Sequence, residues 1–271
     1  MAISAKFIDK EVLALESIKE AQNPLAPIQL FSSRFDAKEV GSVNVKFPRV
    51  GTGRTATNST DYTTGSVTID AVSVTVAEKS LSFPLTGAEL NNGITLADID
   101  SEKLAEFLTD LTAEVTALMT AANFGASVVD TSAFTAADLP KLAVEAKGMN
   151  KVAILEPTQY ALVIPTNGDA LDPNKSAYGF SQGVHMADLA GDGEGFAGGK
   201  SAIAIAGGIS QKWDNFKETE QHVIIQTEMG LPVLYRQFVD STSGNVHGCF
   251  VSLFGCAVAD TGAGSVMTDL A

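Results

Sequence analysis

Two neighbouring stretches near the start of the chain alternate between apolar and polar residues. From residue 43 to residue 47 every second residue is apolar until Pro48 ends the run, and the alternation returns in 65–76, which reads GSVTIDAVSVTV. Alternation with a period of two predicts β-strands, so we expect the two stretches to pair as a ribbon. The apolar phase slips at Val72, which predicts either a bulge near Ala71 or a ribbon covered on both faces.

The segment between these strands, residues 49–65, is rich in Gly, Thr and Ser and predicts a long, mobile tip. A two-stranded ribbon alone is only marginally stable in water. We therefore expect a partner for its apolar residues, either the rest of the chain or a neighbouring subunit, and both alternatives stay open. The candidate subunit-interface residues are Arg54 and Tyr62 in the tip and Val67, Ile69, Val72, Val74 and Val76 in the strand.

Helical periodicity is strongest in the middle of the first half. Apolar residues recur every three or four positions from Leu104 to Ala122. This pattern predicts a helix of about 24 residues, about 36 Å long, that ends at 123–125. Residues 86–93 carry the capping signals of a shorter helix before it.

The first forty residues predict an arm. An amphipathic helical pattern spans residues 8–18. Pro24 and Pro27 exclude its continuation, so an extended connector is expected to follow.

The rest of the chain mixes helical and strand-like patterns. Helices are expected at 135–149 and 157–164, strands at 151–156, 201–208, 222–229 and 264–270, and a loop-rich stretch at 165–200. Strand-like segments at 231–240 and 246–260 flank a turn at 241–245, which predicts a hairpin. This mixture predicts an α/β or α+β fold.

The composition predicts a protein with few charged residues and an excess of acidic ones. Of the 271 residues 45% are hydrophobic and 18% charged, and 32 acidic against 18 basic residues give a formal net charge of −14. This charge argues against broad neutralisation of nucleic-acid phosphates, and the low share of charged residues suits surfaces that bind other copies. The chain shows neither the apolar core of a secretory signal nor a membrane-spanning run, so we expect a soluble protein.

The stretch DGEGFAGGKS, residues 192–201, is the strongest candidate for chemistry because it ends like a phosphate-binding loop. A Walker-type loop needs glycine where Glu194 stands, and a carboxylate there opposes a nucleotide. The glycines also match GxGxxG, but a strand-like segment follows them, which reverses the strand, loop and helix order of a dinucleotide site. We expect a flexible surface loop here.

Other candidate sites lack the spacing that their chemistry requires. Asp188, Asp192 and Glu194 are near enough in sequence to share a divalent cation, but they miss the pattern of a calcium loop, and the three histidines are scattered. Cys249 and Cys256 stand seven residues apart in one predicted strand, which predicts two reduced thiols on opposite faces. We therefore expect no catalytic, cofactor-binding or metal-binding residue and a protein that is not an enzyme.

The order of these elements resembles the major capsid proteins of tailed bacteriophages, whose Hong Kong 97-like capsid fold is shared with encapsulins. The resemblance covers nearly the whole chain and includes KVAILEPTQYALVI and the strand-rich end. It implies an α+β, Hong Kong 97-like capsid fold with four parts. These are an N-terminal arm (1–40), an extended two-stranded loop (41–78), a peripheral domain with a long spine helix (79–126 and 236–271) and an axial domain (127–235).

In this family the extended loop lies over a neighbouring subunit, so the resemblance implies a partner for the GSVTIDAVSVTV ribbon. It implies a structural protein without cofactor that self-assembles, as pentamers and hexamers, into the icosahedral head shell of a virion around double-stranded DNA. Assembly in the host cytoplasm would involve a separate scaffolding protein, a portal and decoration proteins, with no sequence-specific DNA binding and no membrane.

Two alternatives to the phage capsid stay open. One is an encapsulin-type compartment of the same fold, which encloses cargo enzymes. The other belongs to a different class and is a nucleotide-binding enzyme that uses the glycine-rich residues 191–201.

Overall fold

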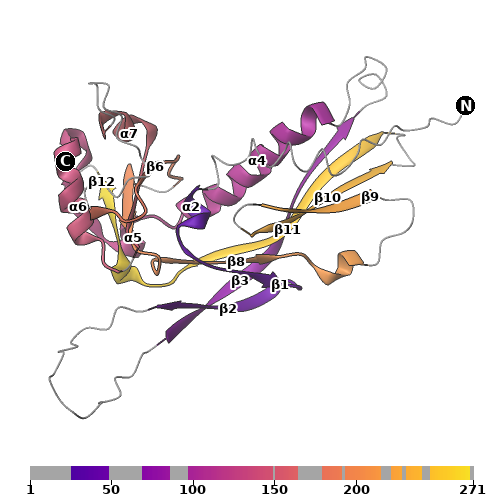
Figure 1. The fold of residues 1–271 in the computed structure, drawn as a ribbon, viewed down its shortest axis with the longest axis horizontal. Helices are drawn as coiled ribbons and strands as arrows, with labels where there is room; N and C mark the ends of the chain where they lie inside the picture. The colour runs from indigo at the N-terminus through magenta and orange to yellow at the C-terminus, as the bar shows by residue number, and fades with distance from the viewer. Residues whose placement is uncertain are drawn as a thin grey trace, which may run out of the picture.

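The computed structural model describes most of the chain. The described residues are 26–48, 69–85, 97–148, 150–163, 179–190, 193–214, 221–227, 230–239 and 245–268. They form two β-sheets at opposite ends of an elongated molecule, and the long helix α4 (Ala97–Thr116) runs along the larger sheet (Figure 1). No helix among these residues has both the length and the apolar character needed to cross a membrane.

The larger sheet joins strands from distant parts of the chain. Its seven strands are β1 (Ser32–Ala37), β2 (Gly41–Pro48), β3 (Ile69–Leu85), β8 (Ile203–Gly208), β9 (Gln221–Gln226), β10 (Pro232–Val239) and β11 (Val246–Val258). The hydrogen-bonded order is β1-β8-β11-β10-β9, and β3 pairs with both β11 and β2. The antiparallel pairing of β10 with β11 confirms the predicted hairpin.

The smaller sheet has five strands in the order β4-β12-β7-β5-β6. They are β4 (Ala126–Asp130), β5 (Val152–Leu155), β6 (Val184–Met186), β7 (Gly195–Gly198) and β12 (Gly264–Thr268). Helix α6 (Leu139–Glu145) packs against β4, β7 and β12, and α7 (Pro157–Val163) packs against β5 and β6. Helix α6 is shorter than the expected 135–149, because Ala146 is extended and Gly148 has a φ of 113°.

The described part of the predicted N-terminal arm is folded into the subunit. A short helix, α2 (Ala26–Gln29), accepts Pro27 because proline is tolerated in a first helical turn. Ile28 and Phe31 are each 1% exposed, and β1 pairs in parallel with β8. Residues 26–37 are therefore packed on the rest of the subunit, the arm as a domain stays a prediction, and the expected helix at 8–18 lies outside the described residues.

The ribbon of β2 and β3 confirms the predicted pairing and corrects the predicted bulge. The antiparallel register runs without interruption from Gly41 opposite Val76 to Pro48 opposite Ile69. The bulge near Ala71 is wrong, because Ala71 lies on the exposed face of a regular strand. The buried face of β3 changes only after Val76, where the strand leaves β2 and pairs with β11.

Helix α4 confirms the predicted long helix but ends earlier than the pattern implied. After Thr116 the chain makes tight turns, with Met119 N donating to Thr116 O (2.9 Å), and it resumes as α5 (Ala121–Phe124). Thr120 between them is extended, with φ −116° and ψ 154°. Apolar periodicity survives this break because Met119 and Phe124 are still directed into the core.

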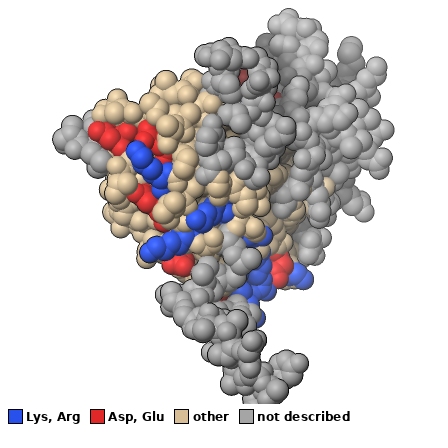
Figure 2. Space-filling model, turned by 60° about the vertical axis from the view of Figure 1, so that its left-hand side comes forward, with Lys and Arg blue, Asp and Glu red and all other residues tan. Residues whose placement is uncertain are grey.

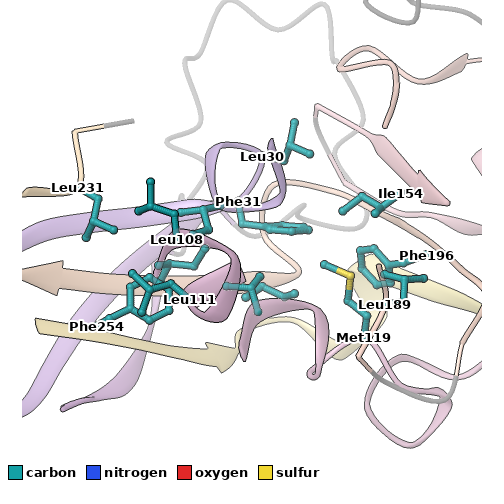
Figure 3. Close-up of a cluster of buried hydrophobic side chains, with 14 of the residues drawn as sticks. Leu30, Phe31, Leu108, Leu111, Met119, Ile154, Leu189, Phe196, Leu231 and Phe254 are labelled. Carbon is teal, nitrogen blue, oxygen red and sulfur yellow. The ribbon is translucent and has the colours of Figure 1, made fainter. Parts of the chain in front are cut away.

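One hydrophobic core runs through both sheets. On one side it holds Leu108 and Leu111 of α4 against Phe254 of β11, and on the other it holds Met119 near Phe196 of β7 (Figure 3). Phe31 joins the two sides, since its ring lies 6.0 Å from that of Phe196 in an edge-to-face arrangement. The continuous core fixes the position of one sheet relative to the other.

The four-part domain division remains a prediction, and the hydrogen-bonded sheets divide the chain at other places. Strand β12, near the C-terminus, belongs to the smaller sheet, whereas β8 and β9, from the middle of the chain, belong to the larger one. The expected short helix at 86–93 lies outside the described residues.

Candidate assembly surfaces

The inner face of the β2–β3 ribbon is covered by the chain itself. Val74 and Val76 are both 0% exposed and cluster with Ala204 and Ala206 of β8 and with Leu253 of β11. Small alanine side chains on β8 let the ribbon lie close to the sheet. The partner of this face is therefore the rest of the chain and not a neighbouring subunit.

Two glycines allow this close approach. A Cβ at Gly255 of β11 would lie 2.1 Å from Thr75 O of β3, and a Cβ at Gly208 of β8 would lie 1.9 Å from Ala37 O of β1. Both contacts are with backbone atoms, so no side-chain adjustment relieves them. Glycine is therefore required at these two positions, where the backbones of β3 and β1 approach β11 and β8 most closely.

The outer face of the ribbon is exposed, and Lys46 is the only charged residue among its cross-strand pairs from Ser42 to Ala71. Its cross-strand pairs are Ser42 with Thr75, Asn44 with Ser73 and Lys46 with Ala71. Beside it, the Arg34 guanidinium donates to Asp36 Oδ1 (2.6 Å) and to Asn44 O (3.1 Å). Small polar side chains at these positions leave a surface that another protein can approach closely.

The structure divides the predicted interface residues into three groups. Val74 and Val76 are buried within the subunit and are not available to a neighbour. Val72 is half-buried, and Ile69 pairs with Pro48. Arg54, Tyr62 and Val67 lie outside the described residues, so their place in an interface stays a prediction.

The α6 side of the smaller sheet carries two strongly exposed apolar residues. Val144 of α6 is 80% exposed and Val128 of the edge strand β4 is 76% exposed. Glu145, next to Val144, accepts hydrogen bonds from Val128 N (3.0 Å) and from Ser265 Oγ (3.0 Å). The two valines therefore belong to one surface of the subunit.

The opposite edge of this sheet carries a second apolar pair. Leu162 of α7 is 56% exposed and Met186 of the edge strand β6 is 52% exposed. A cleft of about 280 Å³ opens beside Met186, lined by Thr109, Thr112, Ala113, Pro157, Met186, Ala187 and Asp188. The smaller sheet thus presents different apolar surfaces at its two edges.

Charges differ between these two sides. On the α6 side Lys147 and Lys200 are exposed and make no ion pair with any described residue, while Lys141 pairs with Asp138 (2.7 Å). Figure 2 views the smaller sheet's end of the molecule and shows lysine and arginine side chains, with acidic side chains beside them, on a mainly uncharged surface. The β6 side carries the exposed Asp188. The α6 side also carries the half-buried Glu145 beside Val144, so its charges are mixed.

The glycine-rich stretch 193–201 is not a surface loop, which corrects the sequence prediction. Its residues 195–198 form β7, which is buried between β12 and β5. A Cβ at Gly195 would lie 2.9 Å from Met267 Sδ, and one at Gly198 would lie 2.5 Å from the Phe196 ring. These glycines serve packing, and a buried strand cannot cradle a phosphate.

The carboxylates near this stretch do not converge. Glu194 accepts a hydrogen bond from Gln159 Nε2, Asp188 is exposed, and Asp192 lies outside the described residues. Within the described ranges no three His, Cys, Asp or Glu side chains form a metal-binding group. His185 contacts Gln182 O (2.8 Å).

The two cysteines lie on opposite faces of β11, as predicted, and both are free thiols. Cys249 packs beside Leu234 and Val251, whereas Cys256 packs against the core beneath α4. Burial, reinforced by Glu114, raises the pKa of Cys256 to about 12. A thiol with so high a pKa is a poor nucleophile near neutral pH.

Comparison with known proteins identifies the fold. No family model matches the chain, and no curated protein matches its sequence. Among solved structures, a virus-like particle from Pyrococcus furiosus matches with a TM-score of 0.58 and 13% identity over 95% of this chain and 97% of that one. A phage-related protein from Bordetella bronchiseptica RB50 matches with a TM-score of 0.55 and 13% identity over 97% of each chain.

The capsid of Cyanophage P-SCSP1u matches with a TM-score of 0.52 and 10% identity over 89% of this chain and 86% of that one. These likenesses extend over nearly all of each chain, so they concern the whole architecture and not one motif. The chain has the α+β, Hong Kong 97-like capsid fold that its sequence pattern resembled.

Proposed function

We propose that this chain is the major capsid protein of a tailed bacteriophage, which self-assembles into the icosahedral head shell around a double-stranded DNA genome. The observation that carries the proposal is the fold, which extends over nearly the full length of a cyanophage capsid protein and of a virus-like particle subunit. The protein has a structural role and acts as a component of the virion.

The two edges of the smaller sheet support this function. A closed ring of identical subunits needs two different surfaces on each copy, because the contact is head-to-tail. Val128 and Val144 on one side, and Leu162 and Met186 on the other, offer such surfaces. In the proposed shell these sides meet around the fivefold and sixfold positions.

The β2–β3 ribbon supports the contacts between rings. Its buried face attaches it to the larger sheet, and its exposed face of Ser, Thr and Asn side chains remains open to a neighbour. A separate scaffolding protein, a portal and decoration proteins are the further partners we propose, with assembly in the host cytoplasm.

Light scattering and negative-stain electron microscopy of the purified protein test the proposal. We expect closed shells tens of nanometres across or flat rings of five or six subunits. A monodisperse monomer or dimer under every assembly condition would contradict it.

A variant of the smaller sheet tests the proposed ring contact. Val144→Asp should strongly reduce particle yield with unchanged far-UV circular dichroism, because Val144 is 80% exposed in the subunit. Val144→Thr keeps the shape without a charge and should assemble. Normal yield from Val144→Asp would exclude this side of α6 from the contact.

A further inference from the structure

Strand β9 forms an open edge of the larger sheet. Thr227 N donates to Leu231 O (3.2 Å), so these residues form a hydrogen-bonded pair of the β9–β10 ladder. Bonded and non-bonded pairs alternate along an antiparallel ladder, and the register continues through β9. The backbone N–H and C=O groups of His222, Ile224 and Gln226 therefore point away from β10, where the described residues place no further strand.

The other edge strands of the two sheets are protected against strand addition. On β4, Glu145 occupies the N–H of Val128. On β1, Arg34 forms an ion pair with Asp36. Strand β2, which pairs only with β3 among the described strands, carries Lys46 and ends at Pro48. Strand β6 has only three residues. Charged side chains and short length are the usual defences of an edge strand.

Strand β9 has none of these defences. Its sequence, QHVIIQ, contains no charged residue and no proline over six residues. An uncharged, β-branched edge of this length binds other strands readily unless something covers it. This contrast between β9 and the other edges indicates that β9 is an interface in the assembled protein.

A row of apolar side chains that crosses neighbouring strands of the larger sheet ends at β9. Val251 of β11 lies opposite Leu234 of β10, and Leu234 lies opposite Ile224 of β9. Val251 and Leu234 are 3% and 2% exposed, whereas Ile224 is 55% exposed. A further apolar residue beyond Ile224 would continue the row and bury it.

We propose that β9 of a second copy of this chain pairs with β9 in an antiparallel arrangement, about a two-fold axis that passes beside Ile224. In this register Ile224 lies opposite Ile224 of the second copy, His222 lies opposite Gln226, and Val223 lies opposite Ile225. The outward backbone groups then meet in hydrogen-bonded pairs, and the apolar rows of the two sheets join.

A second copy is the favoured occupant for two reasons. A two-fold contact requires a self-complementary surface, and in this register an apolar residue meets an apolar one and a polar residue meets a polar one. Two chains with a formal net charge of −14 repel each other, and an uncharged edge is where they approach at the lowest electrostatic cost. The inference rests on the proposed function, because self-assembly supplies the second copy.

Disulfide crosslinking of the assembled full chain tests the register. Bonded partners in an antiparallel pair have Cα atoms about 5.5 Å apart, within the range of disulfides. Ile224→Cys should give covalent dimers under mild oxidation. Val223→Cys and Ile225→Cys should give few dimers alone and many when the two variants are mixed before assembly. Wild type controls for the native thiols, and Val144→Cys, 80% exposed on the other sheet, controls for random collision.

Each outcome has a separate meaning for the inference and for the proposed function. Particles without Ile224→Cys dimers, or with dimers no more abundant than for Val144→Cys, would overturn the β9 contact and leave the capsid function intact. Dimers that form without any particle would support the contact and contradict the shell. If Val223→Cys alone gave as many covalent dimers as its mixture with Ile225→Cys, the proposed register would be wrong.

A charge at the edge gives a second test that does not need cysteine. Ile224→Lys should lose the two-fold contact in reconstructed images while the subunit keeps its circular dichroism spectrum. Val239→Lys, at a residue of similar exposure (53%), is the matched control and should retain the contact. Retention of β9 pairing in Ile224→Lys would overturn the proposal.

Discussion

The two faces of the β2–β3 ribbon have the same backbone and opposite roles. Val74 and Val76 lie on one face, fully buried against β8 and β11, while Ser73 and Thr75, their neighbours in sequence, lie on the other face and are exposed. The buried face stabilises the subunit, and the exposed face is available to other subunits. We propose that alternate residues of one strand serve folding and assembly separately.

The largest expected effect comes from placing a charge on the buried face. Val74→Asp leaves an unpaired carboxylate against Ala204 and Leu253, and should lower the free energy of unfolding by about 3–5 kcal/mol. Urea denaturation measures this change. Ser73→Asp introduces the same charge one residue away and should leave the free energy of unfolding within about 0.5 kcal/mol of wild type.

A charge on the exposed face should reduce assembly although it leaves the stability of the subunit unchanged. Ser73→Asp should form a folded subunit with a reduced yield of particles, measured by sedimentation. Equal stability of the two variants would contradict the assignment of the faces, and normal particles from Ser73→Asp would remove the outer face from the interface.

A smaller effect should follow from adding one methyl group where the ribbon crosses the sheet. Gly255→Ala places a Cβ against Thr75 O and should lower the free energy of unfolding by about 1–3 kcal/mol. At Gly262 the nearest atom is Asp260 Oδ1, 3.4 Å from a Cβ, so Gly262→Ala is the control and should be within about 0.5 kcal/mol of wild type. Thermal unfolding measures both variants. An equal loss of stability in the two would contradict the close approach of β3 to β11 at Gly255.

The opposite side of β11, beneath α4, should show its burial through pH dependence. The pKa of Cys256 is raised from 9.0 to about 12, mainly by burial. Because the folded pKa is the higher one, the thiol contributes stability that is complete below pH 9 and is lost as the pH rises toward 12. Cys256→Ala should lose stability less steeply than wild type between pH 9 and pH 12 in chemical denaturation. Identical slopes would contradict burial of the thiol.

The smallest effect belongs to an exposed ion pair on the smaller sheet. Hydrogen bonds from Lys141 and Thr135 lower the pKa of Asp138, but Lys141 is 66% exposed. A lowered carboxyl pKa contributes stability above the ordinary pKa of about 3.9 that is lost as the pH falls. Lys141→Ala should change the free energy of unfolding by less than about 1 kcal/mol at pH 7, and a larger loss would show a structural role for this pair.

Local pattern was enough to predict most strands and their nearest pairings. Alternation in 43–47 and 65–76 predicted the ribbon, and the turn at 241–245 predicted the β10–β11 hairpin, because both signals lie within the segments that pair. The end of α4 could not be read in this way, since Met119 and Phe124 keep helical spacing although the chain leaves the helix after Thr116.

Features that depend on distant residues were missed. In the sequence, strand β7 resembled a glycine-rich loop. Gly195 is needed because a Cβ there would collide with Met267, which is far away along the chain. Val128 and Val144 carried no signal either, since a single exposed valine is ordinary until the sheet order shows that it lies at an edge. The candidate surfaces could therefore be identified only from the order of the strands in the sheets, whereas the fold class could be predicted from the sequence.

A reconstruction of the wild-type particle by electron cryomicroscopy tests the central claim most directly, which is that exposed edges of the subunit bind other copies. The account predicts rings of five and six subunits in which the Val144 side of one smaller sheet contacts the Leu162 side of the next. Particles in which both sides face solvent, or a protein that stays monomeric, would contradict it.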